Sequence, residues 1–300
     1  MKRKKKKNNG KIFFIFIFIL LLLCVGIKLT VGKIDLNEQD KQTAENAIED
    51  KEEIKENAEL NKDSDKIQKK TLLQEKLENG KYLSENGLPV LMYHFFYDKS
   101  KGESAKDGNW IEVSDFEEQI KYLSENDYYY PTWQEVEDYI DAKQELPEKS
   151  VVITVDDGDP SFFNLAVPIL QKYNAEATSF VITSWYGDVA NNKQKNVSYQ
   201  SHSHDMHKAG TGGKGVMMSW DYNKIKEDLE VSSNILGGAN IFCYPFGQYN
   251  DLDIRVLKDT GYKLSFTTKA GKVKKGTSKY ELPRVRVSGN TSLSSFIKNL

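Results

Sequence analysis

Two acidic residues and a group of histidines have the types and spacing that metal-dependent hydrolysis requires. Asp156 and Asp157 directly follow an apolar run, residues 151–155. The chain has four histidines, and three of them lie close together: His202, His204 and His207. One carboxylate and two imidazoles can hold a divalent cation, and a second carboxylate beside them can take a proton from water. The sequence therefore predicts a metal-dependent hydrolase.

The aspartate pair has a simpler alternative role as a helix N-cap, since Asp often stands between a strand and a helix. Two adjacent carboxylates followed by Gly158 at the end of a buried strand weaken that alternative. Their like charges raise one pKa unless a cation neutralises them. We therefore expect one aspartate to bind a cation and the other to be available as a base.

The histidines allow two different pairs of ligands. His202 and His207 would lie about 140° apart on a helix and on opposite faces of a strand, so only a turn lets both reach one ion. His202 and His204 would share a strand face. The residues alone leave both pairs open, and the alternative is an exposed loop whose histidines have no function.

Two further patterns fit less well. Residues 202–207 are one position out of order from the histidine motif of metallo-β-lactamase-like hydrolases, and no histidine follows His207. Residues 210–215 fit G-x-G-x-x-G, but they follow a loop and begin no clear helix, so a dinucleotide site is not indicated. We expect this segment to be a flexible loop beside the site.

Apolar runs and amphipathic stretches alternate from about residue 84 onward. Strands are expected at residues 88–93, 151–155, 177–183, 241–244, 264–267 and 285–287. Helices are expected after capping boxes at Ser114 and Thr132, and at residues 162–173 and 222–236. This alternation predicts an α/β fold with a parallel sheet, and roughly 215 residues suit a small or incomplete barrel. Asp156, Asp157 and His94 would then lie at the carboxyl ends of strands.

The N-terminal third of the chain differs in composition. Basic residues precede an apolar run at 12–27, which predicts that residues 1–32 form a single transmembrane anchor with everything after it outside the cell. A cleaved signal peptide is the alternative, which would make the protein secreted. Residues 33–83 are charged and poor in aromatics, so we expect a solvated stalk before a domain at 84–300. Cys24 and Cys243 cannot form a disulfide within that domain, and Cys243 is expected as a small buried hydrophobe.

Several of these segments together resemble the NodB-type polysaccharide deacetylases (carbohydrate esterase family 4). Residues 152–158 are similar to that family's T-F-D-D-G motif, with Val155 in place of Phe. Residues 201–207 are similar to the S-H-T-x-D-L-H form of the branch that acts on poly-β-1,6-N-acetylglucosamine. Residues 244–247 resemble its Y-P-Y-G motif, and residues 91–94 and 282–284 also match. The resemblance covers about residues 88–295.

The resemblance implies a deformed (β/α)7-type barrel, the NodB homology domain. It implies that Asp157, His202 and His207 bind a divalent metal, with zinc favoured and cobalt or nickel as alternatives. The ligands of this branch are the outer histidines, so the resemblance selects His207 over His204. It also implies that Asp156 is the general base.

The remaining roles also follow from the resemblance. The chain has no late histidine to act as general acid, and in this branch the early Tyr-His motif takes that place, which assigns His94. A histidine satisfied within the core is the alternative. The resemblance places Phe246 and Tyr244 at the oxyanion or substrate. It groups Arg284 with these substrate-binding residues and expects it to hold the charge of Asp156, with a purely structural salt bridge as the alternative.

The expected activity is removal of N-acetyl groups from an extracellular N-acetylglucosamine polymer, with poly-β-1,6-N-acetylglucosamine favoured. A peptidoglycan or chitin-oligomer deacetylase is one alternative, and a membrane-tethered glycan-binding protein with a degenerate site is another. A polysaccharide synthase or export machinery is a further expected partner. The net charge of −2 gives no indication of nucleic-acid binding. Trp110, Trp185 and Trp220 are candidates for stacking on sugar rings, with core packing as their default role.

Overall fold

The computed structural model describes residues 67–78 and 80–300. The predicted membrane anchor, residues 1–32, and most of the predicted stalk lie outside the described residues. A compact unit comprises Ile67–Leu300. Residues 67–78, at the end of the predicted stalk, are helical, and Lys76 of this helix pairs with Asp127 at 2.6 Å. In the part of the chain that the structure describes, no helix is both long and apolar enough to cross a membrane.

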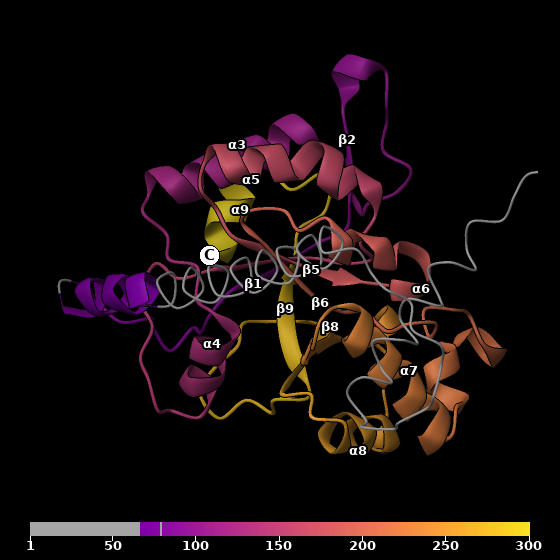
Figure 1. Ribbon diagram of the computed structural model, residues 1–300. Helices are drawn as coiled ribbons and strands as arrows, with labels where there is room; N and C mark the ends of the chain where they lie inside the picture. The colour runs from indigo at the N-terminus through magenta and orange to yellow at the C-terminus, as the bar shows by residue number, and fades with distance from the viewer. Residues whose placement is uncertain (1–66, 79) are drawn as a thin grey trace, which may run out of the picture. The chain divides into compact units, whose positions relative to one another are not determined.

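Seven parallel strands close into a barrel (Figure 1). Their order is β1-β4-β5-β6-β7-β8-β9, and β9 pairs with β1 to complete the ring. The strands are β1 (Val90–Tyr93), β4 (Val152–Val155), β5 (Ala177–Val181), β6 (Val197–Ser201), β7 (Ile241–Cys243), β8 (Leu264–Ala270) and β9 (Leu282–Arg286). The predicted α/β fold with a parallel sheet is confirmed. A separate pair of short strands, β2 (Phe95–Tyr97) and β3 (Trp110–Glu112), projects beyond the barrel.

Helices cover the outside of the barrel. They are α3 (Val113–Glu125), α4 (Trp133–Ile140), α5 (Val167–Lys172), α6 (Thr183–Tyr186), α7 (Tyr222–Ile235), α8 (Asp251–Asp259) and α9 (Leu293–Asn299). Figure 1 shows α3, α5 and α9 together on one side, and α7 beside α8 on another. Because helices cover the strands from outside and side chains fill the barrel inside, every residue of β1 and β4 is buried.

The predicted helix starts have different outcomes. The capping box at Thr132 is confirmed, since Thr132 Oγ1 accepts from the N–H of Glu135 and the Glu135 side chain accepts from the N–H of Thr132. The prediction of Ser114 as a cap is wrong. Helix α3 begins at Val113, two residues earlier than a Ser114 cap implies, and the side chain of Glu112 caps it by accepting from the N–H of Ser114 at 2.8 Å.

The predicted helix at residues 162–173 is divided into two parts. Residues Phe162–Ala166 form a π-helical turn, and α5 follows from Val167. Pro168 lies in the first turn of α5, where its missing N–H costs little. A continuous α-helix would have needed a backbone N–H at Pro168 to bond the preceding turn. The wider π-helical turn before the proline removes that requirement.

Candidate metal and active site

The predicted site residues gather at the carboxyl ends of neighbouring strands. Asp156 and Asp157 follow β4, His94 follows β1 and His202 follows β6. Parallel strands run in one direction, so these ends meet at one mouth of the barrel. The site therefore combines residues from segments that are far apart in the sequence.

Three side chains converge on one point at this mouth. The ligand atoms of Asp157, His202 and His207 all lie within 4.8 Å of one another. Oδ1 of Asp157 is 3.4 Å from Nε2 of His202 and 3.6 Å from Nε2 of His207. This oxygen is buried and has no hydrogen-bond partner among the described residues. An orphaned carboxylate oxygen is costly, and a cation would relieve that cost. Two imidazoles and one carboxylate are a donor set that fits a catalytic zinc ion.

The ring of His202 is held in the orientation that a ligand needs. Its Nδ1 lies 2.7 Å from the carbonyl oxygen of Cys243. A carbonyl only accepts, so Nδ1 carries a proton, and Nε2 is the ring nitrogen that faces Asp157 and that a metal would bind.

A tight turn separates the two outer histidines and brings their side chains together. The carboxylate of Asp228 in α7 holds the turn by accepting from the N–H groups of His204 and Asp205, both at 2.7 Å. Nδ1 of His204 lies 3.0 Å from Oγ1 of Thr183, outside the metal-ligand group. Of the two pairs that the sequence left open, the structure therefore brings His202 and His207 together.

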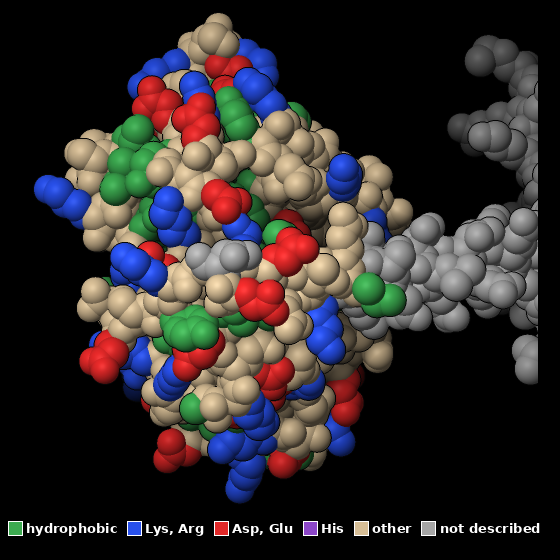
Figure 2. Space-filling view, turned by 90° about the vertical axis from the view of Figure 1, so that its left-hand side faces the viewer, with side chains coloured by type: hydrophobic (Ala, Val, Ile, Leu, Met, Phe, Trp, Pro, Cys, Tyr) green, Lys and Arg blue, Asp and Glu red, His purple; other side chains and the backbone are tan. Residues whose placement is uncertain are grey.

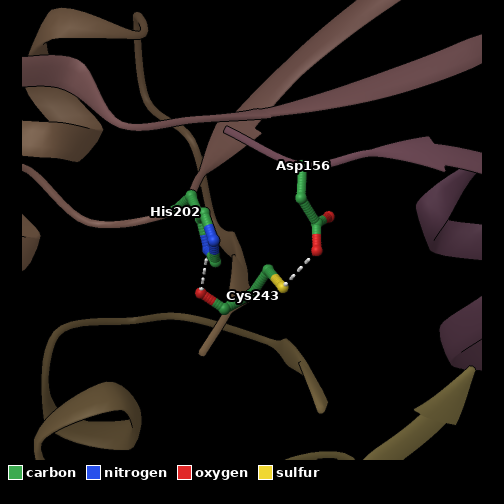
Figure 3. Close-up of side chains that lie close together, drawn as sticks. All are labelled: Asp156, His202 and Cys243. Atoms are coloured by element: carbon green, nitrogen blue, oxygen red, sulfur yellow. Dashed lines mark hydrogen bonds between the residues drawn. The ribbon is translucent and has the colours of Figure 1, made fainter. Parts of the chain in front are cut away.

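Asp156, His202 and Cys243 form a second close group, which Figure 3 shows. Sγ of Cys243 lies 3.5 Å from Oδ2 of Asp156. This group is not a candidate metal centre, because Nη2 of Arg284 lies 2.7 Å from the same carboxylate oxygen and 3.0 Å from the same sulfur. The guanidinium already provides the positive charge that the carboxylate requires.

Arg284 is almost fully buried, and each of its five N–H groups faces an acceptor. Nε donates to the carbonyl of Thr267 at 3.0 Å, and Nη1 donates to Oγ1 of Thr154 at 3.1 Å. Nη1 and Nη2 each donate to one oxygen of Asp156 at 2.7 Å, and Nη2 also faces Cys243. Burial would raise the pKa of Asp156, but this bidentate pairing holds that pKa well below its ordinary value. Because it is buried, Arg284 acts on Asp156 and cannot also contact a substrate.

The two partly exposed histidines of the site have lowered pKa values. Nε2 of His94 lies 3.8 Å from Oδ2 of Asp156. Burial lowers the pKa of His94, and the attraction of Asp156 opposes this change only in part. Burial and the neighbouring His202 lower the pKa of His207 to about 4. His207 is therefore neutral near pH 7, which is the form that can bind a metal.

The turn after β7 lies against the other side of His207. Phe246 is half exposed, and its ring centroid is 4.4 Å from that of His207. Tyr244, in contrast, is fully buried, and its hydroxyl donates to the carbonyl of Tyr280 at 3.0 Å. The side chain of Tyr244 therefore packs beneath the turn, and its contact with a substrate stays a prediction.

Three non-glycine residues of the site have a left-handed backbone. The φ angles are +77° at Asp157, +78° at Ser203 and +58° at Phe246. Each such residue costs about 1–3 kcal/mol and persists only where its surroundings enforce it. The strain therefore marks the three turns that present the ligands and the neighbouring aromatic ring.

Gly247 is the residue that allows the turn at Phe246. Its φ is +69°, and a Cβ atom at this position would overlap the side chain of Thr268. We expect Gly247→Ala to lower the free energy of unfolding by about 1–3 kcal/mol and to reduce hydrolytic activity, because the turn must move away from β8. Urea denaturation measures the first effect. Gly108→Ala is the matched control, since a Cβ there meets open space; equal stability of the two variants would contradict the prediction.

Sequence reasoning missed the polar partners that support the site. Cys243 was expected only as a small buried hydrophobe, yet its thiol accepts from Arg284 and its carbonyl orients His202. Thr154 and Asp228 have comparable supporting roles. The spacing of Thr154, two residues before Asp156, was the one available signal, because residues two apart in extended chain point to the same side.

Comparisons with known proteins agree with the geometry. A family model described as polysaccharide deacetylase matches residues 143–265. A poly-beta-1,6-N-acetyl-D-glucosamine N-deacetylase of Staphylococcus aureus (strain MRSA252) is 30% identical over 233 residues, which cover 68% of this chain and 80% of that protein. The structure of IcaB from Ammonifex degensii is similar with a TM-score of 0.60 and 25% identity, over 72% of this chain and 97% of that one. The Streptococcus pyogenes deacetylase PplD has a similar fold, with a TM-score of 0.61 and 23% identity over 73% of this chain and 98% of that one.

Proposed function

Because this chain belongs to the polysaccharide deacetylase family and is a polysaccharide N-deacetylase of carbohydrate esterase family 4, we propose that its substrate is an extracellular N-acetylglucosamine polymer, with poly-β-1,6-N-acetylglucosamine favoured. The name of the Staphylococcus aureus relative and the S-H-S-H-D-M-H form of residues 201–207 support this choice of polymer. The observation that carries the activity is the convergence of Asp157, His202 and His207 beside the ionised Asp156.

We propose that Asp157, His202 and His207 hold a divalent metal, zinc in preference to cobalt or nickel. The orphaned Oδ1 of Asp157 and the neutral ring of His207 support this assignment. A bound divalent ion would supply a Lewis acid for the acetyl carbonyl and for the attacking water.

The chain's own residues divide the proton transfers between them. Asp156 takes the proton from the attacking water; its Oδ1 accepts one hydrogen bond, from Arg284, and so keeps a free acceptor position. The backbone N–H of Phe246 stabilises the oxyanion. His94 donates a proton to the departing sugar amine; because its pKa is lowered, His94 must take up that proton before this step. The products are acetate and a glucosamine unit.

One face of the molecule carries mixed charge. Acidic and basic side chains are interspersed over the face that Figure 2 shows, without the single-sign field that nucleic-acid binding uses. We propose that residues 1–32 anchor the protein in the cell membrane and that the catalytic domain acts outside, near a polysaccharide synthase or export machinery. The basic residues before the apolar run at 12–27 support this orientation.

Acetate release from candidate polymers tests the proposed substrate. Poly-β-1,6-N-acetylglucosamine, chitin oligomers and peptidoglycan are supplied in turn to the purified protein, and acetate is measured. We expect the highest kcat/KM on the β-1,6-linked polymer. A higher value on chitin oligomers or peptidoglycan would reassign the substrate within the family, and binding of a glycan without acetate release would indicate a degenerate site.

Removal of divalent metal is expected to stop activity without unfolding the domain. The ligands lie at the mouth of the barrel, whereas the core consists of apolar residues from all seven strands. We expect a chelator to lower acetate release by more than about 100-fold and added zinc to restore it. Circular dichroism of the chelated protein measures the fold. Full activity in the metal-free protein would contradict the metal assignment.

A further inference from the structure

A groove of about 310 Å³ is lined by Trp185, whose ring also contacts His207 of the candidate metal site. Its walls come from the segment after β4 and from the segment between β5 and β6, which includes α6. The lining side chains that matter here are aromatic, amide or acidic: Phe163, Asn164, Trp185, Tyr186, Asp188 and Asn192. None of the residues assigned above to the metal, the proton transfers or the oxyanion lines this groove.

Trp185 connects the groove with the metal ligands. Its side chain is half exposed, and its ring meets that of His207 edge to face, with centroids 5.6 Å apart. The segment that carries it is fixed to the site by backbone hydrogen bonds from Ile182 to Asp157 and from Thr183 to Ser203, both at 3.1 Å. A molecule in the groove that contacts Trp185 therefore lies next to whatever occupies the metal site.

The other two tryptophans considered for sugar stacking are less available. The ring of Trp110 stacks on Phe95 at 5.0 Å, and Nζ of Lys106 lies 4.3 Å from its centroid. Nζ of Lys224 lies 3.9 Å from the centroid of Trp220. Cations already cover these two rings, whereas the ring of Trp185 is half exposed and contacts Tyr186 and His207.

The lining matches the chemistry of an amino sugar. A pyranose ring has an apolar C–H face that packs on a flat aromatic ring, and a rim of polar groups that pair with amides such as Asn164 and Asn192. Asp188 is the one charged residue among the described residues that line the groove, and Lys193 and Lys195 nearby do not line it. A carboxylate without a basic partner favours a neutral or cationic ligand and disfavours an anionic one.

We propose that this groove is a subsite for the sugar unit adjacent to the one being deacetylated, and that it accepts N-acetylglucosamine or glucosamine but not a sugar bearing a carboxylate. The inference rests on the proposed function, since it takes the substrate to be an amino-sugar polymer. It provides a physical basis for preferring poly-N-acetylglucosamine over polymers in which the neighbouring sugar carries a free carboxylate.

The first test compares substrates of different length. The measured quantity is kcat/KM for a β-1,6-linked pentasaccharide divided by kcat/KM for the monosaccharide. We expect Trp185→Ala to lower this ratio by about tenfold, because one aromatic contact with the longer substrate is lost. Trp185→Phe keeps a flat ring and should recover most of the loss. Tyr82→Ala is the matched control, an equally exposed aromatic that pairs with Pro147 before β4, at the opposite end of the barrel. An unchanged length dependence in Trp185→Ala would overturn the proposal.

The second test measures binding without turnover. Asp157→Asn removes the proposed metal ligand, and Asn tolerates the left-handed backbone at this position. In this background, calorimetry with the pentasaccharide should show binding that Trp185→Ala weakens about tenfold. Equal affinity with and without Trp185 would overturn the subsite even if the enzyme releases acetate. If binding depends on Trp185 but the wild-type protein releases no acetate, the subsite is supported and the proposed function is refuted.

The charge preference has a separate readout. We expect Asp188→Asn to weaken binding of a fully deacetylated, cationic pentasaccharide by about two- to fivefold at low salt, and to change binding of the acetylated one much less. Raising the salt concentration should remove the difference. Equal losses for the two oligomers would refute the electrostatic part of the proposal.

Discussion

Replacing Asp156 with asparagine is expected to lower acetate release by about 10²- to 10⁴-fold while the metal content stays near that of the wild type. The variant keeps Asp157, His202 and His207, which are the proposed ligands, but its amide cannot take a proton from water. The same change should lower the free energy of unfolding by about 3–5 kcal/mol, because the buried Arg284 loses its counter-charge. Acetate assays, metal analysis and denaturant unfolding measure the three effects.

The stability effect has its own control. In a double variant, Asp156→Asn with Arg284→Met, the unpaired buried charge is absent, so its loss of stability should be smaller than the sum of the losses in the two single variants. Wild-type turnover in Asp156→Asn would show that Asp156 is not the base. Loss of metal in that variant would place Asp156 among the ligands instead.

Replacing His207 with alanine is expected to remove metal and activity together. His207 and His202 both face the orphaned oxygen of Asp157, at 3.6 and 3.4 Å, so the loss of one ring leaves an incomplete ligand set. We expect metal affinity to fall by more than about 100-fold, since even indirect partners of a metal ligand contribute 10- to 100-fold. Competition with a chromogenic chelator measures the affinity.

His204→Ala is the matched control for this prediction. It lies three residues before His207 in the same turn, but its ring faces Thr183. Metal content and acetate release should therefore stay near those of the wild type. Loss of metal in His204→Ala with retention in His207→Ala would reverse the choice between the two histidines.

The sequence predicted secondary structure and site residues correctly where the residue types involved have few alternative structural roles. An unbroken β-branched run identified β4, because a strand buried on both faces needs apolar side chains at every position. The aspartates at its end then had a predictable place at the mouth of the barrel. In contrast, β6 was not predicted, although it precedes the histidine turn.

Polar residues concealed β6. The strand includes Ser198, Gln200 and Ser201, whose side chains pair with partners elsewhere in the fold. Oε1 of Gln200 accepts from the N–H groups of Asn240 and Ile241, at 3.1 and 3.0 Å. Such partners exist only in the folded chain, so the local pattern resembled a loop. Helices α8 and α9 were also not predicted. Their reason is different: they are short, so their apolar faces give a weak periodic signal.

The spacing of the histidines could not select the ligand pair. His202 and His207 converge because Ser203 adopts a left-handed backbone and Asp228 in α7 holds the turn. Neither feature can be read from residues 201–207 alone. The family resemblance selected the same pair, because it carries information on related chains that local geometry lacks.

The position of β9 has a consequence for biosynthesis. This strand lies between β8 and β1 and brings Arg284 to Asp156. A nascent polypeptide that still lacks β9 therefore has no closed barrel. It also has no positive charge to pair with the buried carboxylate of Asp156. The pairing of β9 with β1 also joins the two ends of the domain. We therefore expect the domain to acquire its structure only after its last strand has left the ribosome, so that chains terminated before residue 284 are removed by proteases.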